Sequence, residues 1–125
     1  MSLGKVIPIF RMFNEDKAKE FYLDFLDFRL DWEHRFEDDL PLYMQVSKDH
    51  FTLHLSEHYG DCSPGSAIRI VIEELEELHH VLLGKKYKNS RPGIEVTEWN
   101  TKEMRLLDPF GNKLIFYEEI KNSSN

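Results

Sequence analysis

The chain has 125 residues, a length at which a single compact domain is the usual outcome, with 41% hydrophobic and 31% charged residues. This composition is typical of a folded protein, and the net charge of -7 repels nucleic-acid phosphates and anionic lipid, so we expect neither as a partner. No apolar run is long enough to cross a bilayer, and the lone Cys62 cannot form an internal disulfide, so the expected location is the reducing cytoplasm.

The first half of the chain predicts a strand, a helix and three further strands. Residues 6–13 are apolar and contain Pro8, which favours an edge strand over a helix. Asn14 is a typical helix N-cap, and apolar residues then return every three or four positions over residues 15–26, which predicts an amphipathic helix. Apolar and polar residues alternate after that, as in strands with one wet face. The alternating segments are 28–36, 42–46 and 51–55.

The same order of elements begins again after a turn-rich linker at residues 60–65. A strand is predicted at 67–72, a helix at 73–87, and strands at 94–99, 103–107 and 113–117. The repeat predicts an α+β fold, in which two β-α-β-β-β modules form curved mixed sheets around a shared cleft. We expect a single domain, residues 1–125, with modules at 5–58 and 66–119 and a loose tail at 120–125. An α+β sandwich whose halves are similar by accident is the alternative.

Two motifs stand at matching points of this pattern. The head of the first predicted helix, Asn14 to Tyr22, reads N-E-D-K-A-K-E-F-Y, and the turn before the last strand, Asp108 to Asn112, reads D-P-F-G-N. With the duplicated pattern, they resemble the vicinal-oxygen-chelate superfamily of glyoxalase I, extradiol dioxygenases, and fosfomycin- and bleomycin-resistance proteins. The linker H-L-S-E-H-Y-G-D-C-S-P-G-S at residues 54–66 is most similar to the bleomycin-resistance branch.

The resemblance implies a binding protein. Bleomycin-resistance proteins are homodimers whose grooves sequester a cationic drug with an aromatic tail and leave it unmodified, and a net charge of -7 is compatible with such a ligand. We therefore expect a homodimer that binds a small organic molecule, with a cationic glycopeptide antibiotic as the candidate and antibiotic resistance as the role.

The metal site of the superfamily is expected to be absent. Its ligands come from the first, fourth, fifth and eighth strands, and the resemblance places these positions at Ile7, at Thr52 or His54, at Ala67 and at Ile115. A catalytic divalent ion generally needs about three protein ligands, so one imidazole is insufficient. We predict no metal and no other cofactor.

The remaining inward positions predict the ligand site. Strand alternation places His54, Arg69 and Tyr117 toward the cleft, and aromatic residues of neighbouring segments supply its walls. The predicted ligand-binding residues are Trp32, Phe36, Tyr43, His54, Arg69, Trp99 and Tyr117. Arg69 would repel a cationic drug unless an acidic side chain neutralises its charge. If none does, the expected ligand is an anion. The candidate acids are Glu57, Asp61 and Glu95.

Three functions remain open at this stage. The leading hypothesis is a protein that binds and sequesters a bleomycin-type antibiotic, or a similar small organic molecule, without metal and without catalysis. The second is a divergent lyase, isomerase or dioxygenase-like enzyme of the same superfamily, in which His54 would be the general base. The third is a scaffold module that binds no small ligand.

Overall fold

The computed structural model describes residues 1–121, and the chain forms two compact units. Unit 1 comprises Met1–Ser66 and Pro109–Asn112, and unit 2 comprises Ala67–Asp108 and the residues from Lys113 onward. Each unit contains one four-stranded mixed sheet, so the predicted pair of mixed sheets is confirmed. Most of the tail predicted at 120–125 lies outside the described residues. Within residues 1–121, no helix combines the length and the apolar character needed to span a membrane.

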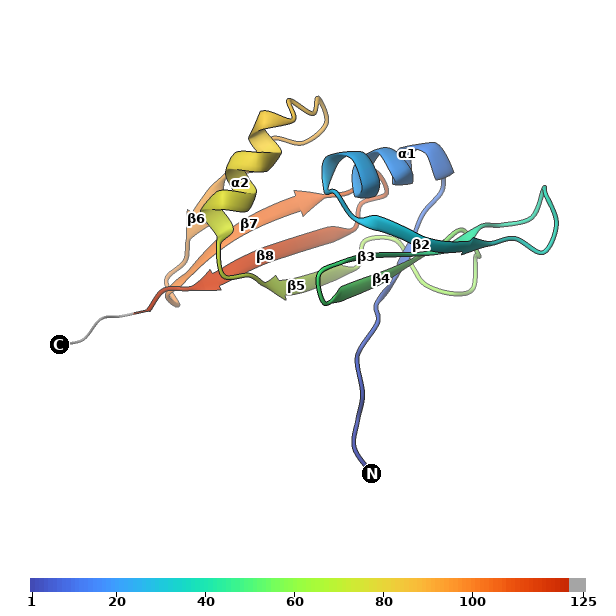
Figure 1. Ribbon diagram of the computed structural model, residues 1–125, viewed down its shortest axis with the longest axis horizontal. Helices are drawn as coiled ribbons and strands as arrows, with labels where there is room; N and C mark the ends of the chain where they lie inside the picture. Colours follow the sequence, from blue (N-terminus) through green and yellow to red (C-terminus); the bar gives the residue numbers. More distant parts are fainter. Residues whose placement is uncertain (122–125) are drawn as a thin grey trace. The chain divides into compact units, whose positions relative to one another are not determined.

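Unit 1 has the strand order β1-β4-β3-β2, in which β1 is parallel to β4 and the other neighbours are antiparallel. A helix lies over one face of this sheet (Figure 1). It begins as an α-helix and ends as a π-helix. The elements are β1 (Ile9–Arg11), α1 (Glu15–Lys19), η1 (Glu20–Phe25), β2 (Arg29–His34), β3 (Tyr43–Lys48) and β4 (Phe51–Ser56).

The first helix follows its predicted cap and apolar face. The side chain of Asn14 accepts a hydrogen bond from the backbone N–H of Lys17 at 2.9 Å, which satisfies one of the free amides at the helix start. The amphipathic helix predicted over residues 15–26 is present, but its second half, η1, has π-type hydrogen bonding. Over six residues, apolar spacings of three and four fit either pattern, so the sequence could not separate them. The buried apolar residues are Ala18, Phe21, Tyr22, Phe25 and Leu26.

The two faces of the unit 1 sheet differ in character. One face carries fully buried apolar side chains and forms the core with the helix, whereas the other carries the alternate residues, which on β3 and β4 are polar or aromatic. The second face therefore offers the polar and aromatic side chains of this sheet. The buried side chains of the core face include Phe10, Met44, Val46, Leu53 and Leu55.

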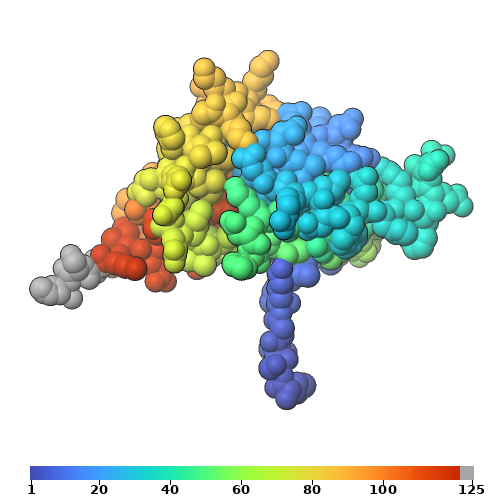
Figure 2. Space-filling model, in the orientation of Figure 1, coloured from blue at the N-terminus to red at the C-terminus, as the bar shows by residue number. Residues whose placement is uncertain are grey.

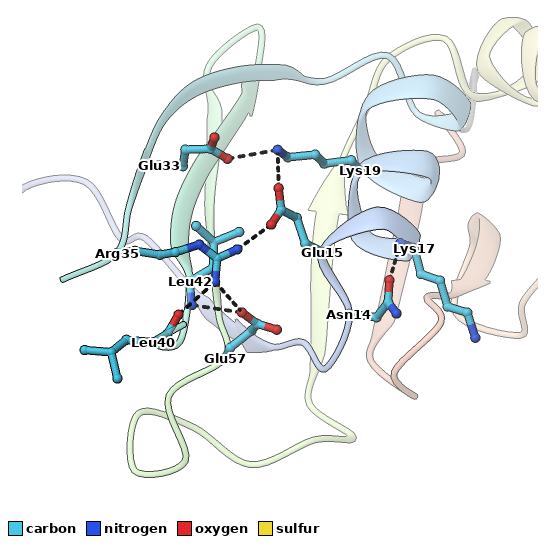
Figure 3. Close-up of polar contacts among 9 residues, drawn as sticks. All are labelled: Asn14, Glu15, Lys17, Lys19, Glu33, Arg35, Leu40, Leu42 and Glu57. Atoms are coloured by element: carbon cyan, nitrogen blue, oxygen red, sulfur yellow. Dashed lines mark hydrogen bonds and ion pairs between the residues drawn. The ribbon is translucent and has the colours of Figure 1, made fainter. Parts of the chain in front are cut away.

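Ion pairs tie the helix to the edge of this sheet, as Figure 3 shows. The Lys19 ammonium lies 2.8 Å from a Glu15 carboxylate oxygen and 2.9 Å from one of Glu33 on β2. Arg35 also pairs with Glu15 and donates a hydrogen bond to the carbonyl oxygen of Leu40 at 2.8 Å. These half-exposed pairs are individually weak, but together they connect α1 to β2 and to the following loop.

Several predicted strand bounds in unit 1 shift for identifiable reasons. The strand expected at 6–13 begins only at Ile9, because Pro8 can accept a hydrogen bond from His54 but has no N–H to donate. The start of the chain extends away from the unit as the blue arm in Figure 2. The strand expected at 28–36 ends at His34, which leaves Phe36 in the loop.

Unit 2 has the strand order β5-β8-β7-β6, and its helix packs on β7 and β8. The predicted helix 73–87 is shorter in the structure, and the predicted strand 94–99 ends early because residues 97–100 form a turn, with Asn100 at a φ of 65°. The elements are β5 (Ala67–Val71), α2 (Leu75–Gly84), β6 (Ile94–Val96), β7 (Thr101–Leu107) and β8 (Lys113–Glu119).

Most of the D-P-F-G-N motif belongs to unit 1, although in sequence it lies between two strands of unit 2. The fully buried Asn112 donates a hydrogen bond to the carbonyl oxygen of Arg11 at 2.8 Å. Its own side-chain oxygen accepts from the backbone N–H groups of Gly65 and Ser66, at 3.2 and 3.3 Å. Gly111 supplies the left-handed backbone of the turn, with a φ of 88°. The side chain of Asn112 is thus hydrogen-bonded to both the first strand and the linker.

Candidate functional site

Strand register aligns one row of side chains across the second face of unit 1. Trp32 on β2 is opposite Gln45 on β3, Gln45 is opposite His54 on β4, and His54 is in register with Ile9 on β1. Tyr43 lies two positions from Gln45 on β3 and therefore shares its face. Three consecutive strands thus place an indole, an amide, an imidazole and a phenol on one face of the sheet.

Three of these rings form a contact cluster, which we call the Trp–Tyr–His cluster: Trp32, Tyr43 and His54. The Trp32 and Tyr43 rings are nearly parallel, with an interplanar angle of 11° and centroids 5.9 Å apart. The His54 ring meets both rings edge-on, at 5.4 Å from Trp32 and 5.1 Å from Tyr43. Trp32 keeps 43% of its surface exposed, so the cluster presents an aromatic surface to a ligand.

A chain of hydrogen bonds runs through this cluster. The Tyr43 hydroxyl lies 2.6 Å from His54 Nδ1, and His54 Nε2 lies 2.9 Å from Gln45 Oε1. The Gln45 amide nitrogen in turn donates to an Asp31 carboxylate oxygen at 3.0 Å. Both ring nitrogens of His54 are therefore engaged within unit 1.

Burial keeps the cluster uncharged. It lowers the pKa of His54, because the imidazolium form loses hydration, and it raises the pKa of Tyr43, to which the negative charge of Asp61 contributes. Burial and Asp61 also raise the pKa of the neighbouring Cys62 thiol. At neutral pH the site thus holds a neutral imidazole, a neutral phenol and a protonated thiol.

Unit 2 holds a second cluster, the Arg–Glu cluster, formed by Arg69, Trp99, Thr101, Glu103 and Arg105. The Glu103 side chain is 1% exposed and accepts from Arg69 at 2.8 Å and from Arg105 at 3.3 Å. The Thr101 hydroxyl and the Trp99 indole N–H donate to it at 2.9 and 3.3 Å. These donors, with Arg69 first, lower the pKa of Glu103 to about 2.

The Arg–Glu cluster corrects one prediction and brings three predicted residues together. The carboxylate that pairs with Arg69 is Glu103, rather than Glu57, Asp61 or Glu95. Arg69 also lies over the Tyr117 ring, with its guanidinium carbon 4.4 Å from the centroid. The sequence analysis missed Glu103, because an acidic residue in an alternating strand is ordinarily assigned to the solvent-exposed face. The partners that bury it become visible only through cross-strand register.

Phe36 stands apart from both clusters. It lies in the loop after β2, is 75% exposed, and its ring contacts that of His34 at 4.9 Å. Strand alternation therefore does not orient it. Its place in a ligand site stays a prediction.

The side chains at the superfamily's metal positions do not fit a divalent ion. Ile7, Ala67 and Ile115 carry no donor atom, and the buried Thr52 hydroxyl accepts a hydrogen bond from Lys5. Both nitrogens of His54 are engaged by protein partners. Across residues 1–121, no group of three or more His, Cys, Asp or Glu side chains could hold a metal ion. No metal-dependent step can be derived from this donor set.

The fold is that of the glyoxalase and bleomycin-resistance proteins. A bleomycin-binding protein complexed with bleomycin is similar with a TM-score of 0.70 and 18% identity, covering 94% of this chain and 99% of that one. The bleomycin resistance determinant of transposon Tn5 has a TM-score of 0.71 and 14% identity, with coverages of 94% and 98%. TnmS3, an antibiotic binding protein from Streptomyces sp. CB03234, has a TM-score of 0.70 and 17% identity, with coverages of 95% and 98%.

The family follows from the sequence itself. A family model described as glyoxalase superfamily protein matches residues 1–123, so the chain belongs to the glyoxalase superfamily. The superfamily predicted from the two motifs is thereby confirmed. No curated protein sequence matches the chain. The structural similarities lie below 20% identity and describe the fold.

Proposed function

We propose that this protein binds and sequesters a small organic molecule without metal, with the Trp–Tyr–His cluster as the main contact surface. The observation that carries the proposal is the neutral aromatic surface formed by Trp32, Tyr43 and His54, the last of which stands at a position where the family resemblance places a metal ligand. A bleomycin-type antibiotic is the first candidate, because its aromatic tail suits ring stacking and its positive charge suits a chain of net charge -7. A cytoplasmic homodimer with a role in antibiotic resistance completes the proposal.

The charge of Arg69 does not oppose this ligand. Arg69 pairs with the buried Glu103 carboxylate, which compensates its charge within unit 2. Trp99 and Tyr117 contact members of the same pair, so these three predicted residues form a preorganised polar and aromatic surface. We include it as a separate candidate contact surface of unit 2, and Phe36 as an exposed aromatic side chain of unit 1.

The Tyr43–His54 pair favours binding over acid–base catalysis. Efficient proton transfer requires donor and acceptor pKa values that lie near each other and near the working pH. Here burial raises the pKa of the phenol and lowers that of the imidazole, so the two values move apart. A lyase or isomerase with His54 as general base would also have to break the hydrogen bond at the ring nitrogen that takes up the proton.

Titration with bleomycin tests the proposal. We expect saturable binding with a change in Trp32 fluorescence, and we expect mass spectrometry to recover the drug unmodified. Trp32→Ala should weaken binding about tenfold, since an aromatic contact contributes about 1.5 kcal/mol beyond its buried area. The matched control is Tyr59→Ala, which removes an aromatic side chain that is 93% exposed in the same unit. No binding, a modified drug, or one tightly held transition metal per chain would contradict the proposal.

A further inference from the structure

We infer that Tyr43 selects ligands that present an N–H donor, in particular an organic ammonium, and rejects ligands that present only acceptor atoms there. This inference rests on the proposed function, because it assumes that the ligand binds at the Trp–Tyr–His cluster. It follows from which partner donates and which accepts in each hydrogen bond of the series Asp31, Gln45, His54 and Tyr43.

Asp31 sets the direction at one end. An ionised carboxylate only accepts hydrogen bonds, so the group that Gln45 turns toward Asp31 must be its amide NH₂. Hydrogen bonds from Ser47 and Gln45 lower the pKa of Asp31, which keeps it ionised at neutral pH. The carbonyl oxygen of Gln45 is then left facing His54 Nε2, 2.9 Å away.

The direction passes from Gln45 to His54. The carbonyl oxygen of Gln45 can only accept, so Nε2 of His54 must carry the ring hydrogen. A neutral imidazole has one N–H, which leaves Nδ1 with a lone pair. The Tyr43 hydroxyl, 2.6 Å from Nδ1, must therefore donate its hydrogen to His54.

Tyr43 is left as an acceptor toward the ligand. Its only O–H hydrogen is used by His54, so the phenol oxygen offers lone pairs to anything that reaches it. Burial and the charges of Asp61 and Cys62 raise the pKa of Tyr43, the His58 ring lies 6.4 Å from the Tyr43 ring, and of these groups Asp61 attracts a cation. An opposing charge on the same sheet face is that of Arg11 on β1, whose guanidinium carbon lies 4.9 Å over the Phe13 ring.

Three naphthalene probes separate hydrogen-bond donation from charge and from ring stacking. They are 2-naphthylmethylammonium, its N,N,N-trimethyl analogue and 2-naphthoate. Calorimetric titration at pH 7 should show the primary ammonium binding about tenfold more tightly than the quaternary one, which has the same charge but no N–H. The carboxylate, whose oxygens would face the lone pairs of Tyr43, should bind most weakly.

Two variants trace the preference to these residues. Tyr43→Phe should abolish the difference between primary and quaternary ammonium while the aromatic ring still supports stacking. Gln45→Leu frees the orientation of His54 and should reduce the same difference, because Gln45 acts as a positioning residue. The ratio of the two affinities is the readout that a merely structural role would not move.

A nitrogen NMR spectrum of the ligand-free protein tests the direction independently. We expect the ¹⁵N shifts of His54 to report the Nε2–H tautomer at pH 7. The Nδ1–H tautomer, equal affinity for both ammonium probes, or a difference that persists in Tyr43→Phe would overturn the inference and leave the proposed function standing. Failure of all three probes and of bleomycin to bind would overturn the proposed function together with the inference.

Discussion

Replacing Glu103 by Gln removes the negative charge that holds the Arg–Glu cluster together. The side chain keeps its shape, but two guanidinium groups then face an amide, and one end of that amide is itself a donor. In the wild-type protein the carboxylate is 1% exposed, and it accepts from both Arg69 and Arg105. We expect the variant to fold with a lower free energy of unfolding.

The magnitude follows from the pKa of Glu103. A shift from the ordinary 4.5 to about 2 corresponds to about 3 kcal/mol in favour of the ionised carboxylate. Because the Arg69 and Arg105 side chains are 44% and 55% exposed, water screens part of this interaction. We therefore expect Glu103→Gln to lower the free energy of unfolding by about 1.5 kcal/mol at pH 7.

Urea denaturation as a function of pH measures this effect, since urea is uncharged and does not screen ion pairs. The pKa is lowered in the folded state, so the stabilisation is complete above pH 4.5 and is lost as the pH falls toward about 2. The difference between wild type and variant should be constant from about pH 5 to 7 and shrink below that. Glu98→Gln, at an exposed position, is the control. Equal urea midpoints at pH 7, or a difference that does not depend on pH, would refute the reasoning.

Three further predictions concern unit 1. Asn112→Ala removes three hydrogen bonds and should lower the free energy of unfolding by about 3 kcal/mol. Urea denaturation measures this loss, with Asn89→Ala at an exposed position as the control. A loss no larger than that of the control would refute the anchoring role of Asn112. His54 should titrate below its ordinary 6.5 by proton NMR, and stability should fall as the pH drops below 6.5, because the unfolded chain takes up the proton more readily. A midpoint at or above 6.5 would contradict this. Reaction with a thiol reagent at pH 7 should be slower at Cys62 than in the urea-unfolded chain, since burial raises its pKa; equal rates would show that the thiol is not protected.

Local patterns in the sequence were sufficient to predict the elements and their order. The alternation of polar and apolar residues marks strands, spacings of three and four mark helices, and Asn14 marks where the first helix begins. These signals depend only on neighbours within a few residues. Since they recur in the same order in both halves, they also predicted two similar sheets and, with the two motifs, the superfamily.

What the sequence could not determine is which residues meet across strands. His54 and Tyr43 were predicted as separate candidates, but their hydrogen bond, and the part that Gln45 plays between His54 and Asp31, depend on register. Glu103 had no sequence signal at all, because the same acid is solvated or buried according to what neighbouring strands place beside it.

The motif at Asp108–Asn112 shows the same division. Its residues predicted a turn and a family. Only the tertiary structure revealed that Asn112 is hydrogen-bonded to Arg11, 101 residues away in the chain, and to Gly65 of the linker, 47 residues away. Turn formation depends on the local conformational preferences of Pro and Gly, so the sequence alone predicts it. A hydrogen bond between distant segments exists only when folding has brought both partners to one place, so the tertiary structure alone decides it.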